Sequence, residues 1–163
     1  MEAIRDILEK VKAGTVGVDE GLGLLKGQFY HDVGCAKVDL HRERRVGYPE
    51  VIYCAGKTSG QVTAILKAML EREVNILATR ASRELYQEIR EICPDARYSP
   101  LAGAVTIRRK EVKAPPGYIA LVTAGTSDLP VAEEAAVTAE LFGNRVERIV
   151  DVGVAGVHRL FFN

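Results

Sequence analysis

The sequence lacks an excess of charge of either sign. It has 22 acidic and 22 basic residues, so nothing in its charge favours binding to nucleic acid or to a membrane surface. No apolar run approaches the roughly 20 residues of a membrane span, and the start lacks the basic-then-apolar pattern of a signal peptide. The three cysteines have no metal-ligand spacing, which is typical of free thiols in a reducing compartment. These absences predict a soluble, cytoplasmic protein with no nucleic-acid or membrane partner.

The most informative stretch that is present reads as a strand, a tight loop and a helix. Residues 118–124 are mostly apolar and lead into the loop Gly125–Asp128, which is typical of a parallel strand covered on both faces. Ser127 or Asp128 is suited to cap the following helix, and Pro130 is suited to its first turn. Because N–H groups at the start of a helix attract anions, we expect a phosphorylated ligand at this loop.

A second strand and loop complete a βαβ unit. The helix is predicted to end near Phe142, with Gly143-Asn144 as a left-handed cap, and the strand 145–152 follows. The carboxyl ends of parallel strands meet at one edge of a sheet. The sequence therefore predicts that two loops lie side by side, one carrying Thr126, Ser127 and Asp128 and the other carrying Asp151, His158 and Arg159.

The first part of the chain has its own α/β pattern. We expect helices at 2–12, 18–25, 61–72 and 82–92 and strands at 50–54, 74–78 and 104–108. The charged, Pro-rich stretch 110–117 is typical of a linker. The fold class is therefore α/β, with a small domain at 1–110 that begins with helices, a linker at 111–117 and a second domain at 118–163. A doubly wound domain usually needs about 100 residues, so we interpret 118–163 as an incomplete domain and the chain as part of a longer enzyme.

Five motifs follow one another along the chain, namely Gly34–Arg42, Gly47–Thr58, Ala78–Arg80, Thr126–Glu134 and Asp151–Arg159. In this order they resemble the LarB family of nickel-pincer cofactor biosynthesis. The last two also resemble the wider aminoimidazole ribonucleotide carboxylase (PurE) superfamily.

The resemblance implies a fold and an activity. Residues 118–163 would be the first βαβ unit of a PurE-like, doubly wound parallel-sheet domain, through which the full-length protein forms a homo-oligomer. The full-length enzyme would be a carboxylase and hydrolase that carboxylates the pyridinium ring of nicotinic acid adenine dinucleotide with CO2 or bicarbonate and cleaves the phosphoanhydride. Cys35, Cys54 and Cys93 do not occupy the position of the family's nucleophilic cysteine, so we expect the 163-residue chain to be inactive alone.

The resemblance and the position of the loops together give the candidate site residues. His158 and Arg159 are the catalytic candidates, with Arg159 as a clamp for phosphate or carboxylate. The carboxylate of Asp128 suits ribose hydroxyls, and Asp151 suits either ribose or a metal ion such as Mg²⁺ on the diphosphate. No tightly bound cofactor or protein-held metal is predicted. The nucleotide-binding candidates are Ala124, Gly125, Thr126, Ser127, Asp128, Asp151, Gly153 and Gly156, and the possible substrate contacts from the first domain are Lys57, Thr79 and Arg80.

Two other functions stay open. One is a true aminoimidazole ribonucleotide carboxylase, although the long first domain counts against it, because that family is typically the small domain alone. The other is a non-catalytic nucleotide-binding or assembly module. At every candidate position an ordinary structural role, such as a helix cap or a surface charge, competes with the functional one.

Overall fold

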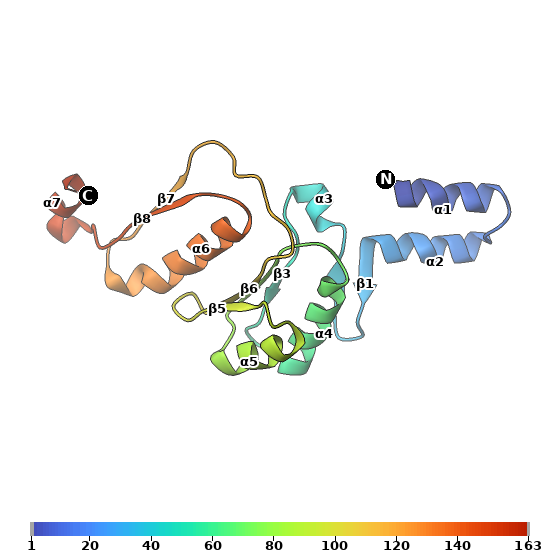
Figure 1. Cartoon of the computed structure of the whole chain (residues 1–163), viewed down its shortest axis with the longest axis horizontal. Coiled ribbons are helices and arrows are strands. Elements are labelled where there is room, and N and C mark those ends of the chain that lie inside the picture. The colour runs from blue at the N-terminus through green and yellow to red at the C-terminus, as the bar shows by residue number, and fades with distance from the viewer. Residues whose placement is uncertain (1, 163) are drawn as a thin grey trace.

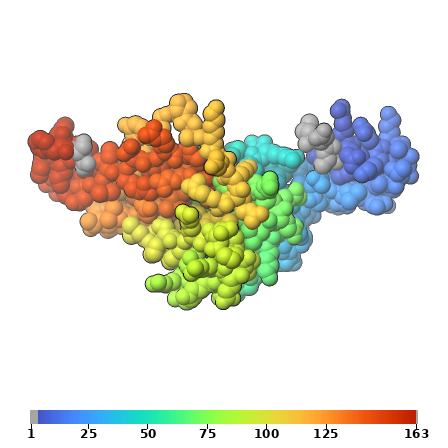
Figure 2. Space-filling view, viewed as in Figure 1, coloured from blue at the N-terminus to red at the C-terminus, as the bar shows by residue number. Residues whose placement is uncertain are grey.

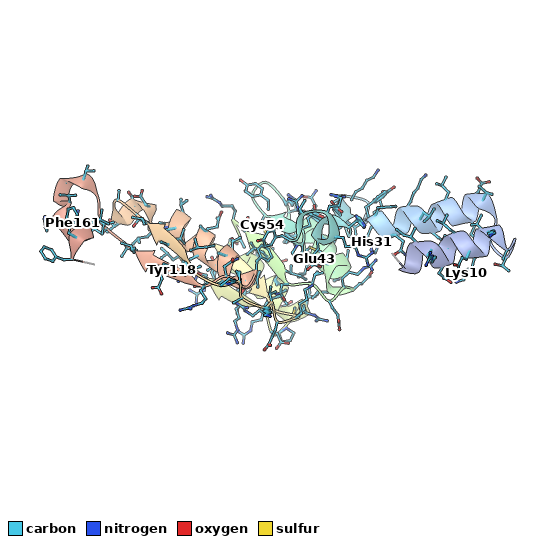
Figure 3. All side chains as sticks on the ribbon, turned by 90° about the horizontal axis from the view of Figure 1, so that it is seen from above. Lys10, His31, Glu43, Cys54, Tyr118 and Phe161 are labelled. Carbon is cyan, nitrogen blue, oxygen red and sulfur yellow. The ribbon has the colours of Figure 1, made fainter. Side chains whose placement is uncertain are left out.

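The computed structural model describes residues 2–162, which form an elongated molecule (Figures 1 and 2). A helical hairpin lies at one end, a four-stranded sheet lies in the middle, and a two-stranded sheet and the last helix lie at the other end. Viewed from above, Lys10 and Phe161 mark the two ends of the long axis (Figure 3).

The helical hairpin consists of α1 (Glu2–Lys12) and α2 (Val18–Phe29). The first helix has the predicted bounds, whereas the second continues four residues beyond the predicted end at residue 25. Gly21 of the second helix is buried at the contact between the two helices. A Cβ atom there would lie 2.5 Å from Cγ2 of Val11, so this glycine permits the close approach of α1.

A small hairpin and a short helix follow, and the sequence patterns did not predict them. The hairpin pairs β1 (Tyr30–Asp32) antiparallel with β2 (Lys37–Asp39), and α3 spans Arg42–Val46. Elements of three to five residues are too short to show a clear hydrophobic period.

The four-stranded sheet has the order β3-β4-β6-β5. Strands β3 and β4 are parallel and joined by α4, so the strands expected at 50–54 and 74–78 form a βαβ unit with the helix expected between them. Strand β6 is antiparallel to both of its neighbours. The bounds are β3 Val51–Tyr53, α4 Ser59–Leu70, β4 Ile76–Thr79, α5 Arg83–Ile92, β5 Arg97–Ser99 and β6 Ala104–Ile107.

Side-chain caps fix the starts of α4 and α5. Thr58 and Gln61 form a reciprocal capping box, in which the hydroxyl of Thr58 accepts from the Gln61 N–H and the Gln61 side chain accepts from the Thr58 N–H. The hydroxyl of Ser82 accepts from the Leu85 N–H at 3.2 Å. Such caps satisfy N–H groups that have no partner inside a helix, so both helices start directly after the strand-end loops.

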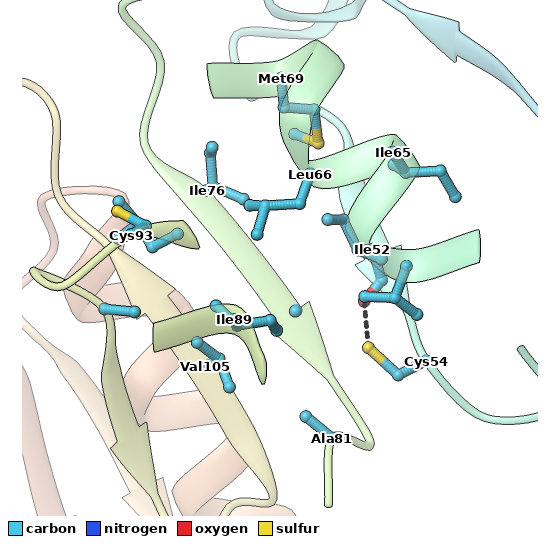
Figure 4. Packing of buried hydrophobic residues seen from close by; sticks show 14 of the residues in the cluster. Ile52, Cys54, Ile65, Leu66, Met69, Ile76, Ala81, Ile89, Cys93 and Val105 are labelled. Carbon is cyan, nitrogen blue, oxygen red and sulfur yellow. Dashed lines mark hydrogen bonds between the residues drawn. The ribbon is translucent and has the colours of Figure 1, made fainter. Parts of the chain in front are cut away.

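The central strand β4 is buried on both faces. Ile76 and Ala78 face α4 and α5, where they join the main core with Ile52, Leu66 and Ile89 (Figure 4). Because side chains alternate along a strand, Leu77 faces the opposite side. There it packs with Ala102, Ala104 and Leu141, and Leu141 belongs to α6 (Leu129–Leu141). Helix α6 therefore covers the second face of the four-stranded sheet.

The βαβ unit predicted for residues 118–152 is confirmed. Strands β7 (Ile119–Val122) and β8 (Val146–Ile149) are parallel, and α6 connects them. The unit ends with the short helix α7 (His158–Phe161). Gly143 is left-handed, with φ of 89°. Its N–H donates to the Glu140 carbonyl, and the Asn144 N–H donates to the Ala139 carbonyl at 2.9 Å, which is the predicted glycine cap.

The prediction that the strand at residues 118–124, which corresponds to β7, is covered on both faces is wrong. In β7, Ile119 is 40% exposed and Val122 is 57% exposed. A two-stranded sheet with one helix has a second face without a covering layer, so an apolar run alone does not establish burial.

Residues 108–118 contain no helix or strand and connect the two sheets. The start of this segment is fastened. The Arg108 guanidinium donates to the Glu140 carbonyl at 3.1 Å, and the Lys110 ammonium pairs with Glu43 at 2.7 Å. The division into domains at 1–110 and 118–163 stays a prediction.

Leu141→Ala tests the contact of α6 with the sheet. The Leu141 side chain is 1% exposed, and its truncation leaves a cavity beside Leu77 and Ala104. We expect the free energy of unfolding to fall by about 2–5 kcal/mol, measured by chemical denaturation. Leu24→Ala, at a side chain that is 44% exposed, is the control and should change stability by less than about 1 kcal/mol. Equal losses in both variants would contradict the packing of α6.

Candidate ligand site

The loops that follow β7 and β8 lie side by side, as predicted. Beyond the regular strands, the Val152 N–H donates to the Thr123 carbonyl at 3.0 Å, and the Gly153 N–H donates to the Ala124 carbonyl at 2.9 Å. These bonds join the Asp151–Gly153 turn to the residues just before the Gly125–Asp128 loop. The structure therefore places the Asp151–Gly153 turn beside Ala124, at the start of the Gly125–Asp128 loop.

Close backbone contact explains Gly153. A Cβ atom there would lie 2.6 Å from the Ala124 carbonyl oxygen, which a larger residue cannot tolerate. Gly156 is also buried and faces the Arg159 guanidinium. A Cβ atom added at Gly156 would lie 2.7 Å from Nε of Arg159. Gly153 thus has a structural role in the turn, whether or not it also approaches a nucleotide, whereas a side chain at position 156 would meet only the movable end of Arg159.

The predicted side-chain cap of α6 is corrected. Residues Thr126–Asp128 form a short 3-10 turn, and Asp128 precedes α6 without capping it by its side chain. Instead, its carboxylate accepts from the Gly125 N–H at 3.0 Å, and its own N–H donates to the Gly125 carbonyl at 3.1 Å. The predicted place of Pro130 in the first turn of α6 is confirmed.

This geometry limits what the loop can bind. The Gly125 and Asp128 N–H groups already have partners inside the loop, and a carboxylate stands beside them. A phosphate at the same point would meet the negative charge of Asp128. A hydroxyl donor, such as a ribose hydroxyl, suits that carboxylate better.

Asp151 and Arg159 form an ion pair across the second loop. The guanidinium Nη1 donates to the carboxylate of Asp151, and Nε donates weakly to the Gly156 carbonyl at 3.4 Å. Asp151 has a φ of 58° and is held by the bond from its N–H to Oγ1 of Thr123 at 3.2 Å. An anion that binds Arg159 must therefore compete with Asp151.

His158 is exposed at the start of the four-residue helix α7. It is adjacent to Arg159 in the sequence, but the loop residues hold Arg159 rather than His158. A catalytic role for His158 thus stays a prediction.

The first sheet contributes three candidate residues with different surroundings. Thr79 ends β4 and is only 8% exposed, while its carbonyl accepts from the Cys54 N–H at 2.9 Å. Lys57 turns back on the end of β3, where its ammonium donates to the Tyr53 carbonyl at 2.7 Å and lies over the Tyr53 ring. Neither side chain reaches the loops of the second sheet in this arrangement.

Arg80 connects the two parts of the molecule. Its Nε pairs with the Glu134 carboxylate of α6 at 3.0 Å, and its backbone is left-handed, with φ of 55°. At the other end of β4, the Asn75 side chain bonds to the Leu141 carbonyl. Helix α6 therefore runs antiparallel to β4, which places the start of α6 and its loop at the same end as Arg80. Glu134 lies six positions after Asp128, which corresponds to about 9 Å along the helix axis.

Sequence reasoning missed several residues that shape the site. Thr123 is 5% exposed and positions Asp151, and its only signal is a hydroxyl at the end of an apolar strand. Asp39 and Glu50 link the first two LarB-like motifs, since the Glu50 carboxylate accepts from the Asp39 N–H. Burial opposes ionisation of Asp39, but bonds from the His41 N–H and the Arg45 guanidinium outweigh it and hold its pKa below the ordinary value.

The thiols of the described chain lie away from these loops. Cys54 follows β3, and burial raises its pKa to about 11, although Lys57 opposes this shift. It is therefore a neutral thiol at pH 7 rather than a thiolate nucleophile. Cys93 is also buried, and Cys35 is exposed in the β1–β2 turn.

A groove of about 850 Å³ lies elsewhere, between residues 42–51 and α6. Its walls include Val46, Tyr48, Val131 and Phe142. The centroids of the Tyr48 and Phe142 rings are 5.2 Å apart. The groove includes none of the candidate loop residues. Within residues 2–162, no three His, Cys, Asp or Glu side chains converge as a metal site, and no helix is long and apolar enough to cross a membrane.

A comparison with protein families identifies the central part of the chain. Residues 30–110 match the LarB/PurE-like N-terminal domain. This match confirms the resemblance to the LarB family. It includes the three motifs of the first part of the sequence and the whole four-stranded sheet, and it ends before the candidate loops.

A relative covers both parts of the chain. An uncharacterized protein of Methanocaldococcus jannaschii is 36% identical over 166 residues, which include 97% of this chain. The chain spans 64% of the length of that relative. The similarity to that protein therefore extends beyond residues 30–110 into the second part of this chain.

Alkylation tests the state of the thiols. At about pH 8, iodoacetamide should modify Cys35 first, because the buried and neutral Cys54 reacts slowly. Peptide mass spectrometry after a timed reaction measures the modification at each position, and denaturant should make all three cysteines reactive. Rapid modification of Cys54 in the folded protein would show that it is an activated thiolate.

Proposed function

We propose that this chain is the N-terminal part of a LarB-type carboxylase and hydrolase. The full-length enzyme would carboxylate the pyridinium ring of nicotinic acid adenine dinucleotide and cleave its phosphoanhydride, within nickel-pincer cofactor biosynthesis. The observation that best supports this proposal is the junction of the two loops after β7 and β8. It occurs in a chain that carries a LarB/PurE-like domain.

The loop geometry suggests a role for each polar group. Asp128 receives ribose hydroxyls, since its second carboxylate oxygen is available besides the one bonded to Gly125. Arg159 gives up its bond to Asp151 and binds a phosphate or the nicotinate carboxylate of the ligand instead. A planar guanidinium suits such an anion because it donates two parallel hydrogen bonds.

The proposed carboxylation needs a nucleophile beyond these loops. A cationic pyridinium is a poor carbon nucleophile, so a thiolate first adds to the ring and gives an enamine. The enamine carbon attacks CO2 and forms the new C–C bond, and loss of the ring proton and the thiolate restores the aromatic ring. In the full-length enzyme, the thiolate would come from a cysteine other than Cys35, Cys54 and Cys93.

The other partners follow from the same proposal. Mg²⁺ that arrives on the diphosphate would find a carboxylate in Asp151 once the ligand has taken Arg159. We propose a cytoplasmic homo-oligomer that assembles through the second domain. CO2 or bicarbonate is the second substrate.

The alternative enzyme is an aminoimidazole ribonucleotide carboxylase. The match of residues 30–110 to the LarB/PurE-like N-terminal domain favours a LarB-type function over this alternative. The paired side chains at the loops also fit a module that binds a nucleotide without catalysis. Binding and turnover measurements together separate the three possibilities.

Turnover is the direct test. The full-length protein should convert nicotinic acid adenine dinucleotide and bicarbonate into a carboxylated pyridinium mononucleotide and AMP, detected by mass spectrometry. The 163-residue chain should give no product, because Cys54 and Cys93 are buried and the exposed Cys35 belongs to the β1–β2 turn rather than to the candidate loops. Turnover of aminoimidazole ribonucleotide instead would favour the alternative enzyme, and turnover by the 163-residue chain would contradict the assignment of the nucleophile.

Arg159→Ala in the full-length protein tests the anion clamp. Loss of a charge-assisted contact costs about 1.5–3 kcal/mol, so affinity for nicotinic acid adenine dinucleotide should fall about 10- to 150-fold. Calorimetric titration of folded protein measures this. Arg97→Ala is the control, because Arg97 is an exposed residue of β5. If Arg159→Ala binds the dinucleotide as tightly as the parent, Arg159 is not the clamp.

A further inference from the structure

Asn75 joins three segments that are far apart in the sequence. It lies just before β4, and its side chain is 1% exposed. Its Nδ2 donates to the Leu141 carbonyl at 3.2 Å, at the end of α6. Its Oδ1 accepts from the Arg109 N–H at 2.8 Å and from the Lys110 N–H at 3.0 Å, at the start of the connecting segment.

The groups that Asn75 binds are ones that regular structure leaves without partners. The last carbonyls of a helix have no N–H donor inside the helix, and residues 109 and 110 lie beyond the end of β6 and outside the sheet. The Asn75 amide satisfies three backbone groups at the same point. This matters because a buried polar group without a hydrogen-bond partner costs stability. An apolar side chain of similar size would satisfy none of them.

Other contacts at this junction have the same effect. The Arg108 guanidinium bonds to the Glu140 carbonyl, and Lys110 pairs with Glu43. Val112 packs closely on Gly143: a Cβ atom added at Gly143 would lie 2.7 Å from a methyl carbon of Val112. The first residues of the connecting segment are therefore attached to α3, to the sheet and to the end of α6.

We propose that Asn75 is a lock that makes residues 2–110 and 118–162 one folded unit rather than two domains on a flexible tether. The lock holds the end of α6 on the sheet, so that α6 keeps its antiparallel course along β4. It thereby fixes the distance between Arg80 and the Gly125–Asp128 loop. The proposal concerns the assembly of the chain and holds whatever ligand the loops bind.

Cleavage of the connecting segment tests the lock. A specific protease sequence inserted between Lys113 and Ala114, which are both exposed, allows one cut. In the parent, the two pieces should stay together in size-exclusion chromatography and native mass spectrometry. In Asn75→Ala, the dissociation constant of the cut pieces should rise at least tenfold. Separation of the parent's pieces at micromolar concentration, or equal affinity in Asn75→Ala, would overturn the proposal.

Two further variants identify the cause. Asn75→Asp keeps the acceptor for Arg109 and Lys110 but removes the donor to Leu141, so its effect should be intermediate. Asn144→Asp is the matched control, because the Asn144 amide donates to the Ala139 carbonyl at 3.1 Å within the same helix end. Its cut pieces should bind as tightly as those of the parent. A loss as large as that of Asn75→Ala would contradict a specific lock.

Hydrogen exchange separates release of the lock from unfolding of the sheet. In uncut Asn75→Ala, the Arg109 and Lys110 amides should exchange at least tenfold faster than in the parent, whereas Asn75→Asp keeps their acceptor and should leave their exchange close to that of the parent. The amides of β4 and β6 should keep their protection in Asn75→Asp. Loss of protection throughout the sheet in both variants would show that Asn75 supports the sheet itself, and the proposal would be wrong.

Discussion

The packing of α6 between two sheets determines where the candidate residues lie. Leu141 covers the four-stranded sheet on one side. On the other side, Arg148 of β8 pairs with Glu133 and Glu140 of α6, and these bonds raise the pKa of the guanidinium above its ordinary value. One helix therefore orients both sheets. Any shift of α6 would move the loop at its start relative to the strand ends of the LarB/PurE-like domain.

Charges at the candidate site are already paired within the protein. Arg159 bonds to Asp151, Arg80 bonds to Glu134, and Asp128 bonds to the Gly125 N–H. The exposed pairs contribute little to stability, because water screens them. A ligand thus exchanges one partner for another at a modest cost, and its own geometry decides whether the exchange is favourable. Such pairs keep the side chains oriented before a ligand arrives.

The sequence predicted the long elements well and the short ones poorly. Helix α1, both βαβ units and the cap at Gly143 follow from hydrophobic spacing and glycine placement, because these are local signals. The β1–β2 hairpin and α3 are too short for such signals. For the site, adjacency of the loops followed from parallel pairing. The roles of Thr123 and Asn75 did not, because they depend on residues 28 to 66 positions away. The exposure of β7 likewise depends on tertiary cover, which an apolar run cannot reveal.

The exposed face of the small parallel sheet has a consequence for the behaviour of the chain in concentrated solution. Tyr118 and Val122 lie on the same face, because side chains alternate along a strand, and they are 64% and 57% exposed. Strands β7 and β8 pair only with each other within the described residues. Each strand thus has one edge of backbone N–H and carbonyl groups that is open to another strand. Apolar side chains beside an open edge favour intermolecular strand pairing. As concentration rises, aggregation should begin at this sheet rather than at the well-covered central one.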